Sequence, residues 1–140
     1  MKTFLDACEG PKTFNQSTSE HLRYIPTGLF MVTKTDMKRY SEGKVQLGIW
    51  LTLWFERTAQ FGKTRVPLMP VLLVVCARWE LLFAFDNGTH YDVGGPVEVR
   101  GTGTVENIDR LLAVLIVLGG LASGEFLEWV RQSVATQYCL

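Results

Sequence analysis

The chain has 140 residues, of which 47% are hydrophobic, so it is long enough for one compact domain with a core and too short for two ordinary domains. Fourteen Lys and Arg residues balance fourteen Asp and Glu residues, and the formal net charge is zero. This balance excludes the basic excess that is typical of proteins that wrap nucleic acid, so we expect no nucleic-acid partner. We predict a single domain over residues 1–140.

Three further features bear on the compartment. The first ten residues contain one lysine and no apolar run of signal-peptide length. The three cysteines are widely spaced and form no CxxC pair, which argues against a disulfide framework or a zinc site. The longest apolar run, residues 111–122, is shorter than the roughly 20 residues that a membrane span needs. We therefore expect a cytoplasmic protein without a membrane partner.

The first half of the chain predicts two strands and one helix. Residues 2–8 read as a short strand that ends at a Gly10-Pro11 turn, and residues 27–34 read as a second strand that ends at Lys34. A helix is expected over residues 41–58 with Ser41 as its N-cap. Because apolar residues cover most of its surface, we expect this helix to be packed on two sides.

The second half predicts a hairpin and then two helices. Residues 68–77 are continuously apolar, as expected of a central strand, and residues 79–85 alternate between two faces and return antiparallel to it. Two short strands, 91–93 and 97–100, are expected around Gly94-Gly95-Pro96. Residues 104–118 predict a buried helix that is closed by Gly119-Gly120, and residues 125–134 predict a short amphipathic helix.

Four sequence blocks occur in a recognisable order. They are Leu22-Arg23-Tyr24 with Pro26, Thr33-Lys34-Thr35, the segment Glu42-Gly43-Lys44-Val45-Gln46-Leu47-Gly48-Ile49-Trp50, and Trp79 with Leu81 and Phe83-Ala84-Phe85-Asp86. In order and spacing they resemble the fungal PD-(D/E)XK nuclease-like family. The resemblance implies an α/β (α+β) fold of the restriction-endonuclease-like kind, with a mixed β-sheet flanked by helices.

The front of the chain departs from that family. Only five residues precede Asp6, so the usual first helix and strand of the fold would be missing. An uncovered sheet edge or face is a site for association. We therefore expect a homodimer, or a covered groove that binds something apolar.

The resemblance also implies a set of site residues. In this family an Asp and a Glu hold a divalent metal ion, a Lys two residues after the Glu supports the attacking water, and a Gln on the next helix assists; hard Mg²⁺ prefers such carboxylate oxygens. By position, the Asp, Lys and Gln correspond to Asp6, Lys34 and Gln46. The Glu position holds Val32, which cannot ligate a metal, so we expect no metal site and no other cofactor. The alternatives for a relocated carboxylate are Glu20, Glu42 and Asp36.

Together these residues predict a binding function. Apolar and aromatic side chains around a few polar groups are typical of a ligand pocket, and the candidates for its lining are Phe30, Val32, Trp50, Trp54 and Trp79. We predict a degenerate nuclease fold that binds or transforms a small, largely apolar molecule at the old active site. If it is an enzyme, Asp6 and Lys34 act as an acid–base pair and Gln46 orients the substrate, as in a secondary-metabolite cyclisation or isomerisation.

Less specific interpretations stay open. Lys34 can be no more than the ion-pair partner of Asp6, Gln46 can cap a strand carbonyl, and Trp50 can be a core residue. Two other functions also remain possible: a metal-dependent nuclease that uses a relocated carboxylate, and a non-catalytic interaction or scaffold protein.

Overall fold

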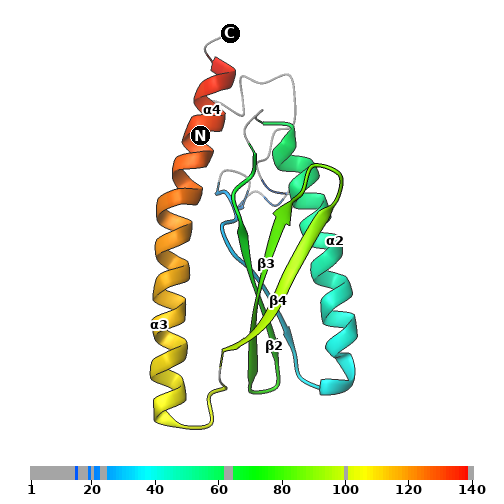
Figure 1. Ribbon diagram of the computed structural model, residues 1–140, viewed down its shortest axis with the longest axis vertical. Helices are drawn as coiled ribbons and strands as arrows, with labels where there is room; N and C mark the ends of the chain where they lie inside the picture. Colours follow the sequence, from blue (N-terminus) through cyan, green and yellow to red (C-terminus); the bar gives the residue numbers. More distant parts are fainter. Residues whose placement is uncertain are drawn as a thin grey trace.

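Four strands form one mixed sheet between two helical layers (Figure 1). The structure is a computed structural model and describes residues 15, 19, 21–22, 25–61, 65–99 and 101–138. The strands β1 (Phe30–Lys34), β2 (Met69–Val75), β3 (Arg78–Asp86) and β4 (Tyr91–Val99) lie in the order β1-β2-β3-β4. Only the β1–β2 pair is parallel. The predicted α/β (α+β) arrangement of a mixed sheet flanked by helices is confirmed, whereas the strand predicted over residues 2–8, with Asp6, lies outside the described residues.

The crossover from β1 to β2 contains helix α2 (Tyr40–Ala59). A short 3₁₀ turn, η1 (Met37–Arg39), precedes it, and the Asp36 side chain caps this turn by accepting a hydrogen bond from the Lys38 N–H at 2.9 Å. The 3₁₀ turn runs directly into α2. The predicted N-cap Ser41 is therefore wrong, because the chain is already helical before it and Asp36 supplies the cap one turn earlier.

The β2–β3 hairpin agrees with its prediction. All seven residues of β2 are buried, as expected for a strand with a neighbour on each side and a helix on each face. Along β3, Leu82 and Ala84 face α2 while Leu81 and Phe83 face the other helix, so the predicted alternation is confirmed.

Strand β4 differs from its prediction because it is one strand and not two. The pairing with β3 shifts register between Leu81 and Phe83, opposite Gly95. Gly95 has a φ of +109°, and a Cβ at this position would lie 3.1 Å from the Leu81 carbonyl oxygen. The glycine thus absorbs an irregularity within a continuous strand, as β-bulges do.

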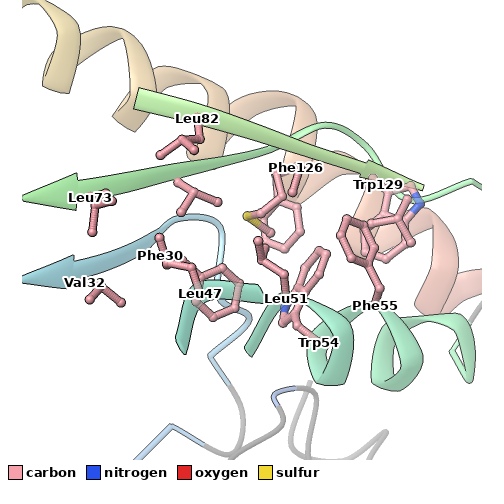
Figure 2. Close-up of a cluster of buried hydrophobic side chains, with 14 of the residues drawn as sticks. Phe30, Val32, Leu47, Leu51, Trp54, Phe55, Leu73, Leu82, Phe126 and Trp129 are labelled. Carbon is pink, nitrogen blue, oxygen red and sulfur yellow. The ribbon is translucent and has the colours of Figure 1, made fainter. Parts of the chain in front are cut away.

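The face of the sheet that α2 covers is filled by what we call the α2-side core (Figure 2). Its buried members are Phe30, Val32, Leu47, Leu51, Trp54, Phe55, Phe61, Val66, Met69, Val71, Leu73, Val75, Leu82, Ala84, Phe126, Trp129 and Val130. The ring of Trp54 is fully buried and lies 6.1 Å from the Phe30 ring and 5.9 Å from the Phe126 ring, measured between centroids. Only one side of α2 takes part, since Val45, Ile49 and Leu53 on its outer side are more than half exposed. The prediction that α2 is packed on two sides is therefore wrong for the described residues.

The C-terminal helix is longer than predicted. Gly119-Gly120 does not end α3 (Val105–Leu121), which continues through the π-helical turn η2 (Ala122–Phe126) into α4 (Leu127–Tyr138). Each glycine in a helix interior costs about 1 kcal/mol, but the residues beyond the glycines gain more by packing into the α2-side core. The extra residue of a π turn offsets the next helical segment by about 100° relative to an unbroken α-helix. This offset keeps Phe126 and Val130 on the same inward side of the helix as Leu118.

The layer beneath α3 is thin. The α3-side core consists of Leu72, Leu81, Val99, Leu111 and Leu118. The prediction of a buried helix here is wrong, because only Leu111 and Leu118 of α3 are buried. By length and apolar composition alone, residues 105–133 are sufficient to cross a membrane, a test that core helices also pass, yet only 17% of their apolar window is buried. The helix as a whole is longer than the apolar run at 111–122, because the glycines do not end it.

Candidate functional site

Lys34 ends β1 with its side chain beneath the first turn of α2. The side chain is only 9% exposed, and its Nζ donates a hydrogen bond to Glu42 Oε1 at 2.7 Å. Gly43 permits this close approach: a Cβ there would lie 2.9 Å from Leu73 Cδ1 and 3.5 Å from Lys34 Cγ. A buried ammonium is costly without a partner, and Glu42 satisfies it.

Glu42 is shared with a second cation. Arg39 donates from Nε to Glu42 Oε2 at 2.8 Å and from Nη2 to Oε1 at 2.7 Å, which is the fork geometry of an arginine–carboxylate pair. The hydrogen bonds from Arg39 and then from Lys34 lower the pKa of Glu42 to about 2, and the same contact raises the pKa of Arg39. Both carboxylate oxygens of Glu42 are therefore committed to cations at neutral pH.

The position of the missing acid lies in the core. Val32 is buried in the α2-side core, and the row of paired strand residues that contains it continues through Leu73 to Glu80 of β3. Glu80 is fully buried, and its Oε2 accepts a hydrogen bond from the Tyr40 hydroxyl at 2.7 Å. Arg78 Nε lies 2.9 Å from Oε1, a charge contact in which the N–H does not point at the oxygen.

The sequence predicts no role for Glu80, although it predicts that the residues of its strand alternate between two faces. The available signal was a single acid inside an otherwise apolar strand, since such a carboxylate must find partners to be buried. Glu80 and Tyr40 thus form a second polar pair. Tyr40 is the first residue of α2 and lies two residues before Glu42 in the chain.

These groups do not form a site for Mg²⁺. The part of the chain that the structure describes contains no group of three or more His, Cys, Asp or Glu residues that could hold a metal ion. Val32 offers no oxygen, and both Glu42 and Glu80 are already bound to cationic or hydroxyl groups. Asp6 lies outside the described residues, so its relation to Lys34 stays a prediction.

The other predicted catalytic residue lies on the same helix. Gln46 is half-buried one turn after Glu42, and it forms no hydrogen bond to any residue that the structure describes. One turn further along, Trp50 is 37% exposed on the outer part of α2. Gln46 therefore retains free amide groups near the Lys34–Glu42 pair, whereas Trp50 is not a core residue.

The predicted aromatic lining does not converge on one pocket. Phe30, Val32 and Trp54 are packed inside the α2-side core, as Figure 2 shows for all three. Trp79 instead packs against the α3-side core, on the opposite face of the sheet. The structure thus separates Trp79 from Trp54 by the thickness of the sheet.

A cavity of about 200 Å³ lies between α2 and the β3–β4 hairpin. It is lined by Lys44, Leu47, Gly48, Leu51, Val71, Leu82, Val93, Gly95 and Pro96. None of the predicted ligand-binding residues contributes to it. The signal in the sequence was Gly48, a glycine inside a helix with open space where a Cβ would be.

Lys44 is the charged residue of this cavity. It is exposed, and its Nζ lies 4.7 Å from the centroid of the Tyr40 ring, within the range of a cation–π contact. The remaining lining is apolar side chains and glycine. Chemically, this arrangement suits a small apolar body that carries an anionic group.

The comparisons with known proteins bear on the family. The sequence matches the family model described as "PD-(D/E)XK nuclease superfamily" over residues 1–127 of the 140. The chain belongs to the PD-(D/E)XK nuclease superfamily. No curated protein and no solved structure matched it significantly. Membership of the superfamily agrees with the mixed sheet and with the parallel β1–α2–β2 unit that carries Lys34 and Gln46.

Proposed function

We propose that this chain is a degenerate member of the PD-(D/E)XK nuclease superfamily that binds a small, largely apolar molecule with an anionic group and does not cleave nucleic acid. The observation that carries the proposal is the cavity beside α2, with its apolar walls and Lys44 at the rim. Its volume of about 200 Å³ exceeds the roughly 150 Å³ of a dry cavity that accepts benzene. It is smaller than the roughly 300 Å³ at which drug-sized sites begin, so a single ring with a short acidic arm is the size of ligand expected.

The state of the old active site supports the loss of cleavage. Val32 is buried where the second acid should stand, and Glu42 neutralises Lys34. The chain also has no net positive charge to attract a polyanion. A cytoplasmic location, kinship with the fungal branch of the superfamily, and a cyclisation or isomerisation that uses Asp6, Lys34 and Gln46 remain predictions from the sequence.

Phenylacetate and its neutral analogue phenylacetamide test the binding site. Ligand-observed NMR should detect binding of phenylacetate to the full chain. Gly48→Leu should abolish it, because the new side chain enters the open space of the cavity. Thr52→Leu adds the same side chain one turn later at an exposed position outside the cavity lining, and it should leave binding unchanged.

The charge of Lys44 provides the second arm of the experiment. Lys44→Met should weaken the binding of phenylacetate about fivefold, which corresponds to the loss of an exposed ion pair, and it should leave the binding of phenylacetamide unchanged. Equal binding to wild-type and Gly48→Leu protein would place the ligand elsewhere and reject the proposal. If Lys44→Met weakens the binding of phenylacetate and of phenylacetamide equally, the ligand does not need an anionic group, and only that part of the proposal is rejected.

One observation favours a second candidate, a nuclease with a relocated carboxylate. Glu42 places a carboxylate oxygen 2.7 Å from Lys34 Nζ, although Arg39 occupies the same group. This candidate requires cleavage of DNA or RNA that depends on Mg²⁺ or Mn²⁺ and that disappears in both Asp6→Ala and Glu42→Gln. Absence of cleavage by the wild-type chain with either ion eliminates it.

A further inference from the structure

The outward face of α3 is apolar, and small residues follow the large apolar ones along it. Away from the buried Leu111 and Leu118, Ile116 is 66% exposed and Leu112 is more than half exposed. Toward the C-terminus, the residues that follow on this face at helical spacing are glycines. We call this face the outer stripe; its members are Leu112, Ala113, Ile116, Gly120 and Gly124. A Cβ at Gly120 or Gly124 would meet no atom within 4 Å, so another backbone can come close at this point.

We propose that the outer stripe is the interface of an antiparallel homodimer in which two copies of α3 cross at Gly120. A large exposed apolar patch on a helix indicates a partner, and small residues at the crossing permit tight packing. In Figure 1 this helix stands along one side of the molecule, with the sheet between it and α2.

The charges at the two ends of the helix select the orientation. A two-fold axis at Gly120 places residue 109 opposite residue 131 of the second copy, since each is eleven residues from the axis. Asp109 is exposed and forms no ion pair with any described residue, and Arg131 has only a 3.8 Å contact with Glu128. The antiparallel pair therefore gains two Asp109–Arg131 contacts at the rim of the interface.

A parallel pair is disfavoured by the same residues. It would place Glu106, Asp109 and Glu128 against their own copies, and juxtaposed like charges oppose association. The charges thus give the interface a direction that the apolar residues alone do not.

A second copy fits this face better than a lipid bilayer does. The uncharged stretch between Arg110 and Glu125 has 14 residues, which is about 21 Å of helix, whereas the hydrocarbon core is about 30 Å thick. The opposite face of the same stretch packs against the sheet through Leu111 and Leu118. Lipid therefore cannot surround the helix without dismantling the α3-side core.

Sedimentation velocity of the full chain tests the dimer. Wild-type protein should be dimeric at micromolar concentration, and Ile116→Glu should raise the dissociation constant more than tenfold. Ile49→Glu is the matched control, because Ile49 is a 55% exposed isoleucine on the outer side of α2. It should leave the dimer intact.

Two further variants test the crossing point and the direction. Gly120→Leu should dissociate the dimer while the monomer keeps or gains helix stability, since leucine is the better helix former. Asp109→Arg and Arg131→Asp should each weaken association about fivefold, and the double variant should recover it.

Four results would overturn the proposal. The first is a wild-type chain that stays monomeric at high micromolar concentration. The second is dissociation by Ile49→Glu in place of Ile116→Glu. The third is a double charge variant that associates more weakly than either single variant. Flotation of the wild-type monomer with phosphatidylcholine vesicles, lost in Ile116→Glu, would assign the face to lipid and also reject the dimer.

Discussion

The two faces of the sheet are covered by helices of very different burial. On the α2 side, aromatic residues from β1, α2 and the turn after α3 meet around Trp54, which is fully buried. On the other side, the apolar run at 111–118 contributes two buried residues, Leu111 and Leu118. Helix hydrophobicity therefore indicates how much a segment is able to bury, and the shape of its surroundings decides how much it does bury. One face is filled by the chain itself, and the other leaves apolar side chains of α3 exposed.

The largest expected effect on the free energy of unfolding is in the α2-side core. Trp54→Ala should lower the free energy of unfolding by about 3–5 kcal/mol, because it leaves a cavity where several aromatic rings meet. Urea denaturation monitored by circular dichroism measures it. Val45→Ala, on the exposed outer side of the same helix, should change stability by less than about 0.5 kcal/mol. Equal losses would show that the packing around Trp54 is not the stabilising feature.

Two equally buried leucines compare the faces directly. Leu51 of α2 and Leu118 of α3 are both almost fully buried. Leu51→Ala should cost about 3–5 kcal/mol, and Leu118→Ala about 2–3 kcal/mol, because the thin layer around Leu118 can relax into the space. The measurement is made at low concentration, where association does not add to stability. A larger loss for Leu118→Ala would remove the contrast between the faces.

The buried polar pair on the α2 side should give a smaller effect. Tyr40→Phe removes the donor to buried Glu80, and we expect a loss of about 1–2 kcal/mol in urea denaturation. Tyr91→Phe is its control, since the Tyr91 hydroxyl donates to Glu56 in an exposed pair at 2.8 Å. The control variant should lower the free energy of unfolding by less than about 0.5 kcal/mol. If the two variants are equal, burial of Glu80 does not strengthen its hydrogen bond.

The smallest effect concerns pH. The pKa of Glu42 is lowered from 4.5 to about 2 in the folded chain, so the unfolded state takes up the proton first as pH falls. The stabilising contribution is complete above pH 4.5 and is lost on acidification toward pH 2. Melting temperatures measured across this window should fall less steeply for Glu42→Gln than for the wild-type chain. Parallel curves would mean that the contacts with Arg39 and Lys34 do not depend on the charge of Glu42.

Several parts of the fold were predictable from the sequence because their cause is local. The uninterrupted apolar residues of β2 identified a strand covered on both faces, and the alternation in β3 identified two different faces. The end of α3 was not predictable in this way. Gly119 and Gly120 predict a stop by local cost, but the packing of Phe126 and Trp129 far from the sheet centre outweighs it.

The sequence predicted which residues belong to the site better than it predicted which of them are in contact. Lys34 was identified as a lysine that needs a partner, and Glu42 was considered only as a relocated carboxylate. Their contact depends on the 3₁₀ turn after Asp36, which brings the first turn of α2 back over β1. The cavity was not anticipated, because it forms between α2 and a hairpin that begins 19 residues after the end of α2. Such spaces depend on the relative placement of elements, which residue patterns do not specify.

The π-helical turn at 122–126 accommodates one residue more than an ordinary α-helix would hold. In an unbroken α-helix Phe126 would be turned about 80° from Leu118, and the extra residue of the π turn returns Phe126 to the face of the helix that packs inward. Substitutions within Ala122–Phe126 that keep the helix should be tolerated at the exposed Ser123. Deletion of a single residue there would restore an ordinary α-helix and keep Phe126, Trp129 and Val130 directed at the core, whereas a deletion between Leu111 and Leu118 would turn one of these two leucines by about 100° out of the α3-side core.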